Sequence, residues 1–82
     1  MKERYRDQYT MLGLNISYYR RLRGYTQEQL AEAVGMEPDS ISKIETAKVA
    51  PSLDALFAIS QALAVPAADL LLFREASERG PQ

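Results

Sequence analysis

The strongest constraint on the fold comes from two short helical segments that only three residues separate. The first opens with the letters TQEQ at residues 26–29, a capping box in which the first and last side chains each accept a bond from the other residue's backbone N–H group. It ends at Gly35, and the second begins at Pro38, a residue favoured in the first turn of a helix. Helices of about eight residues are unstable alone in water. Both segments must therefore pack against further helices of the chain.

The other segments also have the apolar spacing of helices. A first helix is expected to end near Arg23, before Gly24, and residues 1–10 form either an arm or an extension of it, because Gly13 weakens its middle. Ser52 caps a fourth helix, and Pro66 opens a fifth through PAADLLLFREA. Residues 75–82 are expected to be a disordered tail. The side chains expected to face the core from the first and fourth helices are Tyr5, Tyr9, Leu12, Ile16, Tyr19, Leu53, Leu56, Phe57, Ile59 and Leu63. The sequence thus predicts an all-α fold of five helices, with one domain at residues 11–74.

Composition excludes several classes of function. The 82 residues contain neither cysteine nor histidine, so disulfides, thiolate ligands and the commonest general base are absent. The acidic residues are scattered along helix surfaces, which predicts no catalytic or metal site. We expect no enzyme activity, no cofactor and no small-molecule ligand. No apolar run is long enough to span a membrane, and the first residues lack the pattern of a secretion signal, so a cytoplasmic location is expected.

The two short helices and the glycine turn between them form a helix-turn-helix arrangement at about residues 26–46. Around it stand further residues in a characteristic order and spacing: Leu12, Ile16, Tyr19, Arg20, Thr26, Gln27, Leu30, Ala31, Val34, Gly35, Ile41, Ile44, Glu45, Pro51, Ser52, Leu53, Leu63, Val65, Leu70 and Leu71. Through these residues the sequence resembles the Cro/phage-repressor type of DNA-binding domain, the XRE family of transcriptional regulators. The resemblance implies a five-helix, lambda-repressor-like bundle and a sequence-specific regulator of double-stranded DNA.

The resemblance also implies which residues contact DNA. Helix 38–45 would lie in the major groove, which is wide enough to hold a helix. Lys43 would donate to a guanine and Asp39 would accept from a cytosine, which gives a half-site with a G·C pair. An internal salt bridge would join Arg20 to Glu45. The full set of expected DNA contacts is Arg20, Thr26, Gln27, Pro38, Asp39, Ser40, Lys43, Thr46 and Lys48.

Three features depart from the family pattern. Ala47 stands where the family usually has glycine, so either the backbone there has a negative φ or alanine adopts the left-handed region at a cost of about 1 kcal/mol. The loop after the third helix is less basic, with Lys48 followed by Val49 and Ala50. Glu37 and Asp39 put negative charge where phosphates would approach. These acids favour a second reading, in which the fold is a protein-interaction module, antitoxin-like or a regulatory partner, with weak or no DNA binding.

The net charge of −1 is unevenly distributed along the chain. Residues 1–23 hold six basic and two acidic side chains, whereas residues 24–50 hold two basic and five acidic ones. A nucleic-acid footprint depends on local charge rather than on the average. The sequence therefore predicts a DNA-binding domain that is anchored by its first helix.

Four consecutive apolar residues, LLLF at 70–73, exceed what one side of a helix can bury in so small a domain. Scattered surface apolar residues would account for this run, but we favour a homodimer formed through the fifth helix. The residues assigned to that interface are Val65, Pro66, Leu72 and Phe73. A two-fold dimer predicts a palindromic operator with half-sites about one helical turn apart.

Overall fold

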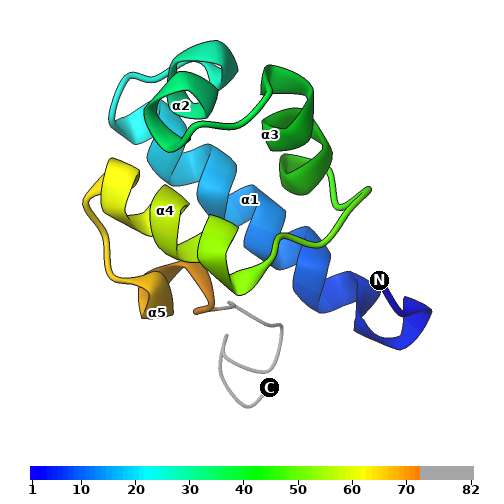
Figure 1. Cartoon of the computed structure of the whole chain (residues 1–82). Coiled ribbons are helices and arrows are strands. Elements are labelled where there is room, and N and C mark those ends of the chain that lie inside the picture. The colour runs from blue at the N-terminus through cyan, green and yellow to red at the C-terminus, as the bar shows by residue number, and fades with distance from the viewer. Residues whose placement is uncertain (73–82) are drawn as a thin grey trace.

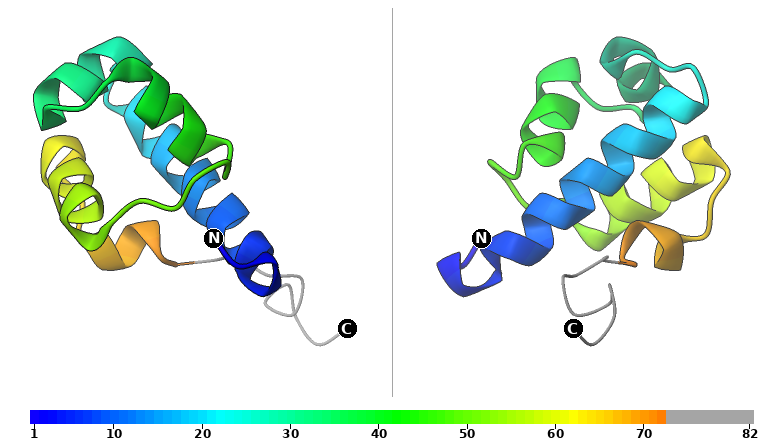
Figure 2. Two further views of the ribbon diagram at one scale, coloured as in Figure 1. Left: turned by 45° about the vertical axis from the view of Figure 1, so that its right-hand side comes forward. Right: turned by 180° about the vertical axis from the view of Figure 1, so that it is seen from behind.

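The computed structural model describes residues 1–72, and these form five α-helices without a β-strand (Figure 1). A 3-10 turn at Glu3–Tyr5 leads into α1, which spans Arg6–Leu22. The other helices are α2 at Gln27–Val34, α3 at Pro38–Glu45, α4 at Leu53–Leu63 and α5 at Ala67–Leu70. Helix α1 is the longest element, and its first turns project beyond the bundle (Figure 2). The all-α class and the five helices predicted from the sequence are confirmed.

The turn signals in the sequence act as expected. Both bonds of the capping box are present: the Gln29 backbone N–H group donates to Thr26 Oγ1 at 3.0 Å, and the Thr26 N–H group donates to Gln29 Oε1 at 2.9 Å. Gly35 ends α2 at φ 74°, in the left-handed region that glycine adopts without strain. Pro38 occupies the first turn of α3. The Ser52 hydroxyl caps α4 by accepting from the Ala55 N–H group at 3.0 Å.

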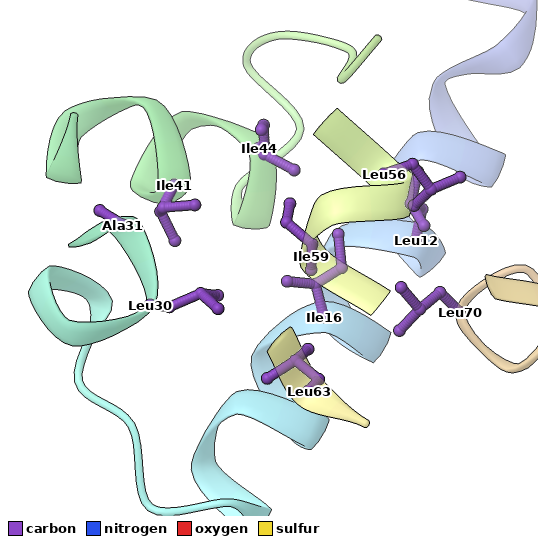
Figure 3. Packing of buried hydrophobic residues seen from close by; sticks show 10 residues of the cluster. All are labelled: Leu12, Ile16, Leu30, Ala31, Ile41, Ile44, Leu56, Ile59, Leu63 and Leu70. Carbon is purple, nitrogen blue, oxygen red and sulfur yellow. The ribbon is translucent and has the colours of Figure 1, made fainter. Parts of the chain in front are cut away.

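The core lies where all five helices meet, with α1 at its centre (Figure 3). Burying such side chains stabilises the fold by about 1.5–3 kcal/mol each. This burial is what keeps the eight-residue helices α2 and α3 folded. The largest fully buried side chains are Ile16, Leu30, Ile41, Ile59, Leu63 and Leu70. In the described part of the chain, no helix is long and apolar enough to cross a membrane.

Several expectations about the core were wrong. Tyr5 lies on the projecting end of α1 and is 44% exposed. In α4 only the narrow face that contacts the bundle is buried, so Leu53 and Phe57, at its flank, remain 66% and 49% exposed. Residues 6–10, for which the sequence left open an arm or an extension of the first helix, belong to α1, which begins at Arg6.

Helix α5 is shorter than its sequence pattern predicts. It ends at Leu70, and the Asn15 side chain of α1 donates to the Leu70 and Leu72 carbonyl oxygens at 2.9 and 3.1 Å, which holds this segment on α1. Leu70 is buried, but Leu71, which stands beside it among the residues that carry the family resemblance, is 47% exposed. Phe73 and the tail at 75–82 lie outside the described residues.

Ala47 adopts the left-handed conformation at the end of α3, with φ 61°. Of the two alternatives for this position, the chain therefore takes the strained one, which costs an alanine about 1 kcal/mol. The methyl group is buried, with 3% of the residue exposed. Its burial offsets part of the strain.

Candidate nucleic-acid interface

Helix α3 has one buried face and one open face. Ile41 and Ile44 pack in the core, while Pro38, Asp39 and Lys43 are exposed on the other side. Two further polar positions, Ser40 and Thr46, are half-buried and exposed respectively. The Thr46 hydroxyl donates to the Ser42 carbonyl oxygen at 2.8 Å, so its oxygen remains an acceptor but its proton is already used.

The two side chains expected to contact a G·C pair are partners of each other. Lys43 Nζ lies 3.1 Å from Asp39 Oδ2, one turn earlier on α3. The pair is open to solvent, with 49% and 74% of the side chains exposed. Such a pair contributes only about 0.3–0.5 kcal/mol, so a nucleic acid could compete for it. An ammonium group has three donors, and the bond to Asp39 leaves two of them free.

A buried ion pair holds α3 from its core side. It joins Arg20 to Glu45, the pair that the family resemblance implies. Arg20 Nε donates to Glu45 Oε2 at 2.6 Å, and Arg20 Nη2 donates to Glu45 Oε1 at 3.1 Å. Arg20 Nη1 donates in addition to the Tyr25 carbonyl oxygen at 2.9 Å. Only 8% of the Arg20 side chain and 5% of the Glu45 side chain are exposed. Arg20 thus ties α1 to the end of α3, and little of its guanidinium is open to a phosphate.

Gln27 joins the same network from the start of α2. Its Nε2 atom donates to Glu45 Oε1 at 2.9 Å, so one carboxylate connects α1, α2 and α3. Neither this bond nor the bond to the Tyr25 carbonyl group leaves a signal in residue spacing, so the sequence does not predict them. A shallow hollow between the starts of α2 and α3 lies over this network, lined by Arg20, Tyr25, Thr26, Gln27, Glu28, Pro38, Asp39 and Ser42.

Gly13 brings α1 and α3 close together. A Cβ atom at this position would lie 2.7 Å from the Ile44 carbonyl oxygen and closer still to that of Glu45. Only a residue without a side chain fits there. From the sequence, Gly13 is only a weak point of the helix, but in the fold it sets the distance between α1 and the end of α3.

Much of the basic charge at the start of the chain is bound internally. Arg23 donates to the Leu63 and Ala64 carbonyl oxygens at 2.7 and 3.3 Å and caps the end of α4. Arg6 pairs with Glu3 at 3.0 Å. Arg21, at the end of α1, and Lys48, after α3, are exposed and enter no ion pair among residues 1–72. Helix α1 therefore offers fewer free cations than its composition suggests.

The residues expected at a dimer interface are only partly open. Pro66 and Leu72 are exposed, Leu72 by 63%, whereas Val65 is half-buried against the core. Phe73 is not among the described residues. The exposed side chains of Leu53 and Leu71 were not expected there. Helix α5 lies beside the first turns of α4 (Figure 1).

Comparisons with known proteins agree with this geometry. A family model described as helix-turn-helix, HTH_3, matches residues 16–70. An uncharacterized HTH-type transcriptional regulator of Methanocaldococcus jannaschii is 35% identical over 60 residues, which cover 73% of this chain and 91% of the relative.

Two solved structures are also similar. The N-terminal DNA-binding domain of SinR from Bacillus subtilis superposes with a TM-score of 0.72 at 34% identity and covers 84% of this chain and 99% of that domain. PlcR from Bacillus thuringiensis, solved with a peptide and DNA, gives a TM-score of 0.73 at 36% identity and covers 85% of this chain and 25% of PlcR.

Proposed function

Because the chain belongs to the HTH_3 helix-turn-helix family of transcriptional regulators, we propose that it binds double-stranded DNA in a sequence-specific way as a homodimer. It has the lambda-repressor-like fold of regulators that are not enzymes. The observation that carries the proposal is that α3 has a buried apolar face and an exposed polar face. The buried Arg20–Glu45 pair holds the helix in this orientation.

In the proposed complex, α3 lies in the major groove with its exposed face toward the base edges. Lys43 donates to guanine O6 and N7, and Asp39 accepts from cytosine N4. Their mutual contact at 3.1 Å holds both side chains on the same side of the helix. Pro38 and Ser40 complete this surface, the first through apolar contact with a thymine methyl group.

The DNA backbone would be bound at the start of α2. The first N–H groups of a helix have no partner within the helix and attract phosphate. The half-buried Gln27 side chain is oriented there by its bond to Glu45, which leaves its second amide proton for a phosphate oxygen. Thr26 and Lys48 would add contacts to neighbouring phosphates, and Thr46 would add one when its hydroxyl proton turns from the Ser42 carbonyl oxygen to the phosphate. We assign Arg20 the task of positioning Gln27 and α3, since its guanidinium is bound within the protein.

The proposed homodimer forms through the end of the bundle that holds α5. Apolar side chains that are exposed there would be buried when two copies associate. The proposed interface comprises Pro66, Leu72 and the edge of Val65, extended by the exposed Leu71. A two-fold dimer matches a palindromic operator with half-sites one helical turn apart. Such a regulator would act in the cytoplasm.

Selection of bound duplexes from a random pool tests the proposed base contacts. We expect the protein to enrich a palindromic sequence. Lys43→Ala should weaken binding to that sequence by about 1–3 kcal/mol and remove the preference for G·C at one base pair. Lys48→Ala is the matched control: as a phosphate contact, Lys48 should weaken all sequences alike. If Lys43→Ala also weakened binding to every sequence equally and changed the base preference at no position, Lys43 would be a phosphate contact and the assignment would be wrong.

A dimer through α5 should depend on Leu72. We expect Leu72→Glu to shift the protein toward a smaller species in sedimentation experiments, because the substitution places a charge in the buried part of the α5 interface. Val49→Glu alters another exposed apolar residue, 40% exposed, in the loop after α3 and should leave the dimer intact. Unchanged association of the Leu72 variant would show that α5 is not the interface.

A protein-interaction module remains the second candidate function. Glu28 and Asp39 both line the hollow between α2 and α3, the surface that DNA phosphates would approach. Failure to enrich any sequence from the pool at low salt, together with a protein partner that binds this hollow, would favour it.

A further inference from the structure

The face of α1 that points away from the core carries large apolar side chains that the proposed DNA contacts and α5 do not use. Leu14, Tyr18 and Leu22 follow one another at four-residue intervals and are 55%, 60% and 58% exposed. A shallow depression on this face is lined by Leu14, Ser17, Tyr18, Arg21 and Leu22. Spacing of four residues puts these side chains on one side of a helix, so the exposed apolar surface is continuous.

Two opposite charges lie at equal distances from Leu14 along α1. Asp7 lies seven residues before Leu14, and Arg21 lies seven residues after it. Seven residues are close to two helical turns, so all three side chains share one face. Both charged residues are exposed, and neither enters an ion pair within residues 1–72.

We propose that this α1 face binds the same face of a second copy of the chain, antiparallel, with the two-fold axis at Leu14. In this arrangement Leu14 packs on the partner subunit's Leu14. Asp7 then lies opposite the partner subunit's Arg21, and the reciprocal pair forms at the other end, as an isologous interface requires. The small side chains of Thr10 and Ser17 flank Leu14 and permit close approach of the two helices.

The aromatic part of the stripe fits the same register. Tyr18 lies four residues after Leu14 and Met11 three residues before it, so an antiparallel copy brings the partner subunit's Met11 to the Tyr18 ring. Contacts between a thioether and an aromatic ring are favourable. A parallel arrangement would instead place Asp7 next to the partner subunit's Asp7, which repels.

This surface is separate from the one proposed for α5. Asn15 bonds the end of α5 on a different side of α1, whereas Leu14, Tyr18 and Leu22 point into solvent. Two different two-fold surfaces on one chain join dimers into a closed tetramer or an open row. The α1 contact would thus link dimers bound at neighbouring operators.

Disulfide formation in single-cysteine variants tests the register. The chain has no cysteine, so Leu14→Cys introduces the only thiol. We expect mild oxidation to convert Leu14→Cys to a covalent dimer, because the two-fold axis puts both thiols together. Leu22→Cys is the matched control on the same face: its two copies would lie about 24 Å apart along the helices, far beyond the roughly 7 Å between Cα atoms that a disulfide spans. Equal crosslinking of both variants, or none of Leu14→Cys, would overturn the proposal.

Charge exchange supplies an independent test that needs no covalent bond. With Leu72→Glu as the background, any remaining association is independent of α5. In this background, Asp7→Arg and Arg21→Asp should each cause loss of sedimenting dimers, since like charges then face each other, and the combined exchange should restore them. A combined variant that stays monomeric while the background dimerises would contradict the pairing. Neither test involves DNA, so failure here leaves the proposed regulatory function standing.

Discussion

Replacing Arg20 with methionine lowers the free energy of unfolding by about 3–5 kcal/mol. The substitution leaves the Glu45 carboxylate, 5% exposed, with one remaining side-chain donor, Gln27 Nε2. A buried charge that has lost its partner is costly because no water replaces the lost bonds. The Tyr25 carbonyl oxygen also loses its donor, Arg20 Nη1.

Urea unfolding measures this effect, and a double variant controls for it. Arg20→Met combined with Glu45→Met removes both charges, and replacement of a buried ion pair by apolar side chains is often neutral or stabilising. We therefore expect the double variant to regain most of the stability that Arg20→Met loses. If Arg20→Met alone costs less than about 1 kcal/mol, as for a surface pair, the network does not hold α3 in place.

Replacing Gly13 with alanine destabilises the protein by about 2–3 kcal/mol. Helix propensity alone predicts the opposite, a gain of about 1 kcal/mol for alanine in the middle of α1. The new Cβ atom, however, would lie 2.7 Å from the Ile44 carbonyl oxygen and still nearer to that of Glu45. Both are backbone atoms at the end of α3, so relief requires a shift of the whole helix.

The sign of the change in stability decides between these two effects. Thermal or urea unfolding of Gly13→Ala gives it directly, and Ser17→Ala, a half-buried position one turn later on α1, is the control in which the effect should stay small. Because α3 carries the proposed base contacts, Gly13→Ala should also weaken DNA binding at protein concentrations where it is still folded. A stabilised Gly13→Ala variant would show that α3 tolerates displacement without cost.

The helices with strong local signals could be predicted from the sequence. Thr26 with Gln29, Gly35, Pro38 and Ser52 mark helix ends through their own backbone preferences, and all of them act as expected. The salt bridge between Arg20 and Glu45 was inferred from resemblance rather than from spacing. Its geometry, with Gln27 and the Tyr25 carbonyl group as further partners, depends on how three helices meet.

The errors have two physical causes. The first is that periodicity shows which residues share a helix face but not how wide the buried face is, and the second is that distant partners leave no local pattern. Leu53 and Phe57 belong to the apolar side of α4 yet remain largely in solvent. Arg23 is a surface cation in the sequence, but in the fold it caps α4 through the Leu63 and Ala64 carbonyl groups. Such carbonyl partners are 40 and 41 residues away along the chain, and no local pattern reveals them.

Helix α3 has a buried face that the core holds and an exposed face that contributes little to stability. This separation affects how mutation can change the DNA sequence that such a regulator binds. Pro38, Asp39 and Lys43 contribute little to the core, so they can mutate to recognise another operator at small cost in stability. Gly13 and the Arg20–Glu45 pair cannot vary in this way, since they hold the helix itself. Binding specificity in this chain can therefore drift while its architecture stays constant, and a new specificity is better built on the whole bundle than on an isolated helix-turn-helix peptide.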